Sequence, residues 1–277
     1  GDLLDDDILK KIQIWKPKII FHLAAQSAGE SAYDNPKKDF LSNGFATFKL
    51  CKMAKKIRLK HFIYTSSVAI YGSYSQKIIK EQDRVSPDSI YGVSKYSGEM
   101  FVDQIFKKTQ TKTTIFRLSN IYGPGENLNY TKKGMVKIYS SYIWKKKPII
   151  VKGSKKRVRT ITFIDDCISI LSRTINNKSL KKNEILNLSS GKSFTVKELI
   201  REILLVNKNL NYKVIEKKGT IGDSFELKIS NKKLKNRFKK LKFTPIKHGL
   251  KKYFDWINKI PINGKLERYH PLKKNSY

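Results

Sequence analysis

Short apolar runs alternate with longer amphipathic stretches through the first half of this chain. Runs of strand length occur at 18–23, 61–65 and 113–118, and stretches typical of helices lie at 36–57 and 91–107. Strands that alternate with helices are typical of a parallel sheet covered by helices on its faces. The pattern therefore predicts an α/β fold.

The pattern changes at Gly123-Pro124-Gly125, after which 126–133 is polar and irregular. The following elements are expected next: a helix at about 135–144, a strand at 159–164 that enters a helix through Asp165 and Asp166, and a returning strand at 185–188. From Thr195 onwards, a helix, two short strands and two helices complete the chain. The earlier polar segment 78–89 is expected to be a loop.

These elements predict two lobes. The first comprises 1–122, and 159–190 partly returns to it. The second comprises 123–158 and 191–277. With 277 residues and 39% hydrophobic content, the chain can bury a substantial core.

Tyr91 and Lys95 stand four residues apart in the stretch 91–107, and Ser67 lies 24 residues before the tyrosine. Positions i and i+4 share one face of a helix, so the ammonium of Lys95 can approach the phenol of Tyr91. A free tyrosine titrates at about pH 10, and a neighbouring cation favours its phenolate. Such a pair is a candidate base, and Ser67 could orient the substrate hydroxyl.

The same spacing also arises by chance, when a solvated lysine lies beside a packed ring. The context favours chemistry, because the run at 61–65 reads as a buried strand that stops at Thr65, Ser66 and Ser67. Ligands gather at such carboxyl ends of strands in open α/β sheets. These residues therefore indicate a candidate hydride-transfer site.

Motifs over nearly the whole chain, in a characteristic order and spacing, resemble those of one family. They are Gly1-Asp2-Leu3, 22–26, Asn43, 65–67 with Tyr71-Gly72, 91–95, 117–124, 159–166, 187–191, and 243–245 with Gly249-Leu250 and Trp256. The chain resembles the extended short-chain dehydrogenases/reductases, specifically the NAD-dependent epimerase/dehydratase family acting on nucleotide sugars. The resemblance implies a Rossmann-like doubly wound parallel sheet with a smaller mixed α/β substrate lobe.

The family's opening motif does not precede Asp2. That motif is a strand, a glycine-rich turn and a helix N-terminus that cradles the dinucleotide pyrophosphate. Gly1-Asp2-Leu3 resembles a segment that the family places after its third strand. We therefore expect an N-terminally truncated sequence that lacks roughly 50–60 residues, including the residue that selects NAD or NADP.

The resemblance assigns catalytic and cofactor roles to individual residues. Tyr91 would be the acid/base, Lys95 would lower its pKa and hold the nicotinamide ribose, and Ser67 would bind the reacting oxygen, with Ser66 as the neighbouring alternative. The expected cofactor is NAD, and NADP is not excluded. The residues expected to contact it are Asp2 and Leu3 at the adenine, Ala24, Ala25 and Gln26 at the pyrophosphate and ribose, and Asn43, Ser66, Tyr91, Lys95 and Leu118.

On the substrate side, the resemblance implies that Asn120 and Arg159 contact the sugar-nucleotide diphosphate. A guanidinium matches phosphate geometry as a fixed cationic fork. This chain departs from the family after Arg159, where Thr160 and Ile161 replace the usual aspartate and aromatic residue. Thr220 stands where many relatives have a second phosphate-binding arginine. The nucleotide is therefore left open, with a UDP-sugar as the expectation.

The residues after Ser67 narrow the reaction. The family's dehydratases commonly carry an Asp-Glu pair there, and its decarboxylases a glutamate, whereas this chain has Val68 and Ala69. Neither side chain can move a proton, which disfavours dehydration. The resemblance then favours an epimerase similar to UDP-glucose 4-epimerase. A 4-keto reductase or dehydratase of the same family and a non-catalytic dinucleotide-binding protein are the alternatives.

Composition adds expectations about partners. The net charge of +35 invites a nucleic-acid interpretation, but lysine outnumbers arginine 49 to 9 and is spread along the chain, so no specific nucleic-acid site is expected. Cys51 and Cys167 lack metal-ligand or disulfide-framework spacing, which predicts core residues, no metal and a cytoplasmic protein. No apolar run is long enough for a membrane span. The resemblance implies a homodimer formed through 36–57 and 91–107.

Overall fold

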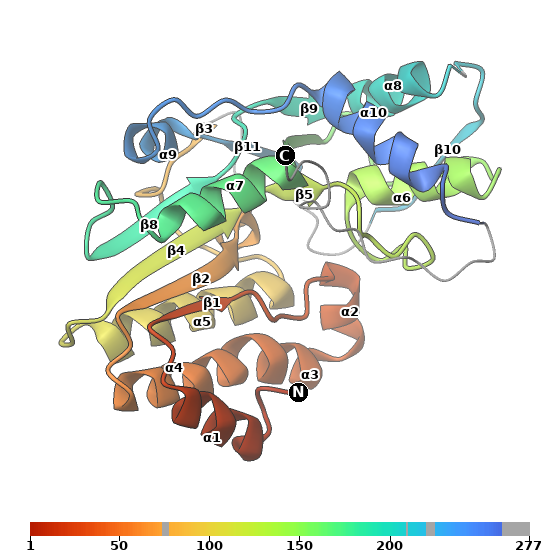
Figure 1. Cartoon of the computed structure of the whole chain (residues 1–277). Coiled ribbons are helices and arrows are strands. Elements are labelled where there is room, and N and C mark those ends of the chain that lie inside the picture. The colour runs from red at the N-terminus through yellow and green to blue at the C-terminus, as the bar shows by residue number, and fades with distance from the viewer. Residues whose placement is uncertain (74–77, 209, 220–224, 262–277) are drawn as a thin grey trace.

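The computed structural model describes residues 1–73, 78–208, 210–219 and 225–261, and its centre is a parallel sheet. Four strands pair in the order β1-β2-β4-β8, all parallel (Figure 1). Their bounds are Ile19–His22 for β1, His61–Ser67 for β2, Lys112–Leu118 for β4 and Asn183–Leu188 for β8. The predicted α/β class and the predicted strands at 18–23, 61–65, 113–118 and 185–188 are confirmed.

Helices cover both faces of this sheet, as Figure 1 shows. Alternate residues of β2 explain the arrangement, since side chains of a strand point to opposite faces. Phe62 and Tyr64 pack with α1, α4 and α5, whereas Ile63 packs with α7 and α9. The bounds of these helices are Asp6–Trp15 for α1, Ala46–Lys56 for α4, Ile90–Phe106 for α5, Ile164–Thr174 for α7 and Lys232–Arg237 for α9.

The predicted helix at 36–57 is confirmed, but it is not uniform. It consists of α3 (Pro36–Phe40), a π-helical turn η1 (Leu41–Phe45) and α4. The π-helical turn carries Asn43 with its side chain buried. Single π-turns inside α-helices are often found at functional sites.

A second group of strands and helices lies beyond the carboxyl ends of the central strands (Figure 1). One sheet pairs its strands in the order β3-β11-β7-β5, with β9 antiparallel to β7, and β6 pairs with β10. The bounds are Ile78–Ile79 for β3, Asn120–Tyr122 for β5, Ile149–Lys152 for β6, Val158–Phe163 for β7, Ser193–Thr195 for β9, Val214–Lys217 for β10 and Glu226–Ile229 for β11.

A separate hydrophobic cluster packs three helices against β5, β6 and β7. The helices are α6 (Met135–Trp144), α8 (Val196–Val206) and α10 (Ile246–Ile257). The predicted helix at 135–144, the strand-to-helix step at Asp165 and Asp166, and the order of elements after Thr195 are all confirmed. A capping box at Thr195 and Glu198 explains where α8 begins.

The prediction of a loop throughout 78–89 was wrong at its first two residues. Ile78 and Ile79 form β3, which pairs with Lys228 and Ile229 of β11. Ile79 is buried in a cluster with Ile229. Two residues are too few for a strand periodicity to show in the sequence, and the partner strand lies about 150 residues away. Helices α1 and α2 (Gly29–Asp34) were not predicted either.

Helix α5 lies unusually close to β2. A Cβ added to Gly98 would come within 2.3 Å of the hydroxyl of Tyr64, so only glycine fits there. The Tyr64 hydroxyl donates a hydrogen bond to the backbone carbonyl of Lys95 at 3.3 Å. The strand that carries Ser67 therefore fixes the helix that carries Tyr91.

Candidate functional site

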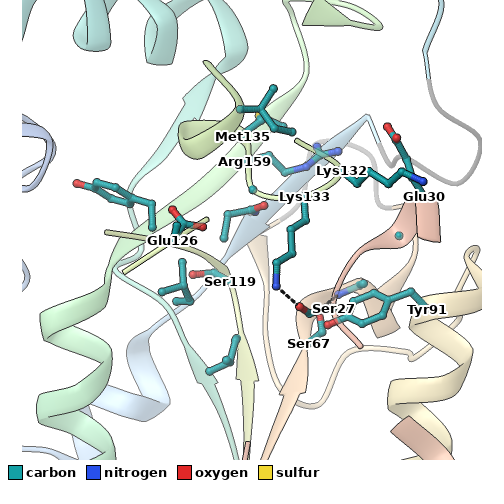
Figure 2. A pocket seen from close by; sticks show the side chains of 18 of the residues that line it. Ser27, Glu30, Ser67, Tyr91, Ser119, Glu126, Lys132, Lys133, Met135 and Arg159 are labelled. Carbon is teal, nitrogen blue, oxygen red and sulfur yellow. Dashed lines mark hydrogen bonds between the residues drawn. The ribbon is translucent and has the colours of Figure 1, made fainter. Parts of the chain in front are cut away.

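A cavity of about 860 Å³ opens beyond the carboxyl ends of β2 and β4. Figure 2 shows that side chains from the central sheet and from the second group of elements both line it. Predicted site residues that line it are Ser66, Ser67, Tyr91, Leu118, Asn120 and Arg159. The fold therefore brings residues that are 93 positions apart in sequence, from 66 to 159, to one cavity.

Ser67 and Tyr91 meet at this cavity (Figure 2). Ser67 ends β2, and its hydroxyl accepts a hydrogen bond from the backbone N–H of Ala69 at 3.2 Å. Ser89 caps α5 by accepting from the N–H of Gly92, which sets Tyr91 in the first turn. Burial raises the pKa of Tyr91 to about 12, although a hydrogen bond with Ser67 acts in the opposite direction.

Lys95 is fully buried one turn further along α5, with its ammonium 4.4 Å from the ring centroid of Tyr64. Burial lowers the pKa of Lys95 to about 7, and the carboxylates of Glu99 and Asp39 oppose this shift. The expected lowering of the Tyr91 pKa by Lys95 is not found. Burial has the largest effect on the pKa of both side chains, because the charged form of each would lose part of its hydration.

A buried polar cluster joins the expected cofactor residues Gln26 and Asn43. The amide nitrogens of both donate to one carboxylate oxygen of Asp39, at 2.7 Å and 3.2 Å respectively. The same nitrogen of Asn43 lies 3.0 Å from the hydroxyl of Ser94. Asp39 was not identified from the sequence, where it reads as one more polar residue on a helix.

Several buried polar atoms on β1, β2, α3 and η1 have no hydrogen-bond partner within the described part of the chain. They are Nδ1 of His22, Oδ2 of Asp39, Oδ1 of Asn43 and Oγ of Ser66. Buried polar atoms are normally hydrogen-bonded. Buried polar atoms without partners are therefore the chemistry expected where a polar ligand binds.

The other expected cofactor residues do not line the 860 Å³ cavity. Ala24 and Ala25 are exposed immediately after β1, at the side of the sheet where that strand ends. Leu3 packs against the hydrophobic cluster beneath α4. Asp2 is exposed and accepts a hydrogen bond from the N–H of Leu4 at 2.9 Å.

On the opposite wall, Asn120 and Arg159 lie on the neighbouring strands β5 and β7. The amide of Asn120 donates to the carbonyl of Thr160 at 3.4 Å, and Nη1 of Arg159 donates to the carbonyl of Val158 at 2.8 Å. Burial lowers the pKa of Arg159 to about 10, with repulsion from Arg157 as a further cause. Thr220 lies outside the described residues.

Sequence reasoning missed the residues that tie the two walls together across the mouth of the cavity. The ammonium of Lys132 lies 2.6 Å from Asp34, and that of Lys152 lies 2.7 Å from Glu30. The ammonium of Lys133 donates to Ser27 (Figure 2). The sequence does show a polar segment after Gly123-Pro124-Gly125, but it does not show which residues this segment contacts.

The sequence model of the NAD dependent epimerase/dehydratase family matches residues 1–189. The chain belongs to this family. The chain is similar to the UDP-glucose 4-epimerase of Mycolicibacterium smegmatis, 27% identical over 62% of this chain and 55% of that protein. The dTDP-D-glucose 4,6-dehydratase of Homo sapiens is 26% identical over 76% of this chain and 59% of that protein. The chain thus spans somewhat more than half the length of these relatives.

Solved structures of similar proteins share the fold. The UDP-glucose 4-epimerase of Thermotoga maritima, solved with UDP-glucose, is 25% identical to this chain. It aligns with a TM-score of 0.85 over 94% of this chain and 83% of that chain. The predicted Rossmann-type architecture is confirmed. Among the residues that the structure describes, no helix is long and apolar enough to cross a membrane.

Proposed function

We propose that this family member interconverts C4 epimers of a nucleotide sugar by oxidising and then reducing that carbon. The observation that carries the proposal is the meeting of Ser67 and Tyr91 with Asn120 and Arg159 at one cavity. The first pair can handle a sugar hydroxyl, and the second pair can hold an anionic group. The UDP-glucose 4-epimerases among the similar proteins support this reading.

The residues present fit a nicotinamide dinucleotide. Buried atoms of His22, Asn43 and Ser66 have no partner in the described residues, and the ammonium of Lys95 is suited to hold ribose hydroxyls. When bound, the dinucleotide would accept a hydride from C4 and return it. Residues proposed to contact it are Asp2, Leu3, Ala24, Ala25, Gln26, Asn43, Ser66, Tyr91, Lys95 and Leu118. We propose NAD as the form used.

Tyr91 is the proposed acid/base. With a pKa of about 12 it is a neutral phenol at neutral pH, the form that can donate a proton to a 4-keto oxygen. Removal of the C4 hydroxyl proton needs the phenolate, which the hydrogen bond with Ser67 favours. Ser67, already hydrogen-bonded to Tyr91, would hold the reacting oxygen between the two side chains.

The second wall is proposed to bind the diphosphate of the substrate, with Arg159 as a charged donor and Asn120 as a neutral one. A UDP-sugar is the proposed substrate, because UDP-glucose is bound in the similar Thermotoga maritima structure. We further propose that 1–122 with 159–190 serves the cofactor, and that 123–158 with 191–277 serves the substrate.

Dehydration is the second candidate, because the human relative is a dehydratase. Val68 and Ala69 argue against it. Both line the cavity directly after Ser67, and neither can act as an acid or base. A 4-keto reductase would use the same residues but release the oxidised cofactor. A protein that only binds a dinucleotide would have no need for Ser67 beside Tyr91.

We also propose a homodimer in the cytoplasm. Large apolar side chains are exposed on α3, η1 and α5, namely Phe40, Phe45, Val93 and Met100. The rings of Phe48 and Phe101, which join α4 to α5, lie 5.1 Å apart beside them. Exposed apolar patches commonly mark interfaces. Light scattering of the protein and of a Met100→Glu variant would test this, and a monomeric unaltered protein would contradict it.

The decisive assay incubates the full-length protein with NAD⁺ and a panel of UDP- and GDP-sugars, followed by chromatography and mass spectrometry. Isobaric conversion to a C4 epimer, lost in Tyr91→Phe, is the expected result. Loss of one water from the sugar would show dehydration. Consumption of NADPH with a 4-keto sugar, without epimerisation, would show a reductase.

A further inference from the structure

Four charged side chains, carried by α3, α5 and β4, are buried near one another. The exposed fractions are 2% for Lys95, 1% for Asp39, 3% for Glu99 and 4% for Arg117. Taking a charge out of water is costly unless another charge or a set of hydrogen bonds compensates it. The two carboxylates are therefore expected to serve the two cations, and their geometry shows how they divide this task.

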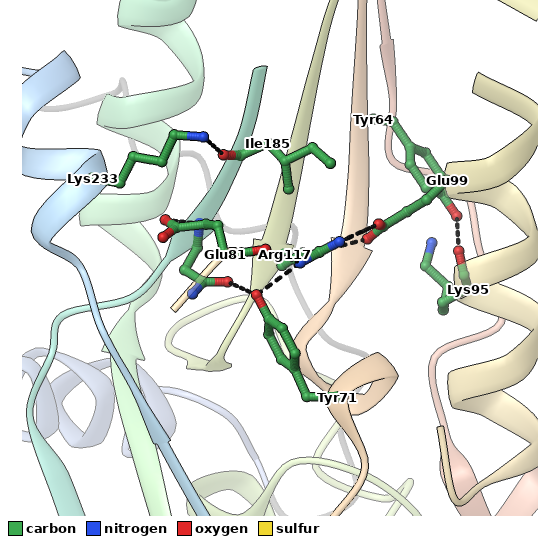
Figure 3. Close-up of polar contacts among 9 residues, drawn as sticks. Tyr64, Tyr71, Glu81, Lys95, Glu99, Arg117, Ile185 and Lys233 are labelled. Carbon is green, nitrogen blue, oxygen red and sulfur yellow. Dashed lines mark hydrogen bonds and ion pairs between the residues drawn. The ribbon is translucent and has the colours of Figure 1, made fainter. Parts of the chain in front are cut away.

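Glu99 forms an ion pair with Arg117. Nε of Arg117 lies 3.1 Å and 3.3 Å from the two carboxylate oxygens, and Nη2 lies 2.8 Å from one of them (Figure 3). Arg117 also donates to the hydroxyl of Tyr71 at 2.9 Å. Both oxygens of Glu99 are thus engaged by a guanidinium on β4, which anchors α5 to the sheet.

Asp39 has a different environment, on α3. One of its oxygens accepts from Gln26 and Asn43. Burial raises the pKa of Asp39, and Ser94, the residue before Lys95, and Gln26 oppose this shift. The other oxygen has no hydrogen-bond partner within the described part of the chain. The charge of Asp39 is therefore balanced by neutral donors alone among its hydrogen bonds, which leaves it to act on Lys95.

A carboxylate accepts hydrogen bonds and cannot donate them, so Asp39 also decides how two amides point. Asn43 must turn its nitrogen towards Asp39, which leaves its oxygen without a partner in the described residues. Gln26 turns its nitrogen the same way and its oxygen to the N–H of Ala28. An amide at position 39 would offer a donor as well and would remove this constraint.

We propose that Asp39 is a positioning residue of the hydride-transfer site: its carboxylate orients Gln26 and Asn43 for the dinucleotide and keeps Lys95 an ammonium. The proposal rests on the proposed function. Asp39 touches neither reacting atom nor substrate in this role. It acts through its neighbours, from a helix that carries none of Ser67, Tyr91 and Lys95.

Both carboxylates act on Lys95 electrostatically, although only Glu99 is bonded to another cation. Burial lowers the pKa of Lys95 to about 7, and Glu99 and then Asp39 raise it. The other groups that face Lys95 are His22 on β1 and Tyr64 on β2. Burial and Lys95 together lower the pKa of His22 to about 3, so that imidazole is neutral near pH 7. Loss of the Asp39 charge must therefore move the Lys95 titration to lower pH.

The first test follows the ¹³Cε signal of Lys95 with pH in the protein alone, assigned by its absence in Lys95→Arg. We expect the midpoint in Asp39→Asn to fall by roughly one pH unit, as one buried opposite charge is removed. Asp103→Asn, which neutralises an exposed carboxylate on α5, should leave it unchanged. An unchanged midpoint in Asp39→Asn would overturn the proposal.

Two more measurements separate this inference from the proposed function. NADH binding to the full-length protein, followed by fluorescence, should weaken roughly tenfold in Asp39→Asn and remain in Asp103→Asn. Unweakened binding would overturn the orienting role. An unaltered protein that binds NADH but turns over no sugar would refute only the proposed reaction. If Asp39→Asn does not fold, the matched pair Asp39→Glu and Asp39→Gln makes the same comparison, and equal midpoints would overturn it.

Discussion

The buried cluster around Lys95 and the rim of the cavity are built in opposite ways. Around Lys95, the polar side chains are buried and bonded to one another. Asp39 accepts hydrogen bonds from neighbouring amides, and Arg117 forms an ion pair with Glu99. Across the mouth, Lys132 and Lys152 reach the exposed carboxylate of Asp34 and the partly exposed carboxylate of Glu30 through flexible side chains. Buried networks are rigid and costly to break, whereas exposed ion pairs contribute little to stability. The difference suggests fixed geometry for chemistry and an adjustable rim for access.

The largest effect is expected at the reacting end of the buried cluster. Tyr91→Phe removes the phenol proposed to exchange the proton, so kcat should fall about 10²- to 10⁴-fold with little change in folding. The epimer assay measures it. Tyr96→Phe, on the same helix and outside the cavity lining, is the matched control. Equal activity in the two variants would remove Tyr91 from the mechanism.

The next effect concerns stability of the same cluster. Arg117→Met leaves Glu99 buried without its cation and should lower the free energy of unfolding by about 3–5 kcal/mol. Urea denaturation measures this loss. The double variant Glu99→Gln with Arg117→Met should recover part of it, because no unpaired charge remains. A double variant as unstable as the sum of the two single variants would show that the pair is not coupled.

A smaller effect is expected on the wall that is proposed to bind the substrate. Arg159→Ala should raise KM for the nucleotide sugar by about 10- to 100-fold, the range for a lost hydrogen bond to a charged group. Steady-state kinetics measure it, with Arg201→Ala on the exposed side of α8 as the control. An unchanged KM would place the diphosphate elsewhere.

The smallest effect is expected at the rim. Lys132→Ala and Lys152→Ala should each change the free energy of unfolding by less than about 1 kcal/mol, and added salt should remove the difference. Lys10→Ala is the comparison, because it breaks an exposed ion pair with Asp7 on α1 and not at the rim. A loss of several kcal/mol in Lys132→Ala would mean that the rim is part of the rigid structure.

What the sequence could predict follows from the range of the interactions involved. Ser67, Tyr91 and Arg159 stand in local patterns and family motifs. Those signals were enough to select them from the sequence, and the structure brings all three to one cavity. Asp39 could not be found this way, because its role depends on how α3 packs against Gln26 and Ser94.

Two other features show the same limit. The pairing of β3 with β11 depends on residues about 150 positions apart. The pKa of Tyr91 is the other case: the sequence predicted that Lys95 lowers it, whereas burial raises it to about 12. Spacing on a helix gives proximity, but it does not give the depth of burial that dominates both titrations.

The π-helical turn Leu41–Phe45 gives the chain an unusual sensitivity to changes in length. Such a turn accommodates one residue more than an α-helix does, and one residue corresponds to about 100° of rotation around a helix axis. Deleting one residue there would let α3 and α4 merge into a regular helix. The half before the deletion would then turn relative to the half after it, and Asp39 would leave Lys95 while Phe48 stayed against Phe101. A deletion scan of this turn would therefore be harsher than any substitution scan.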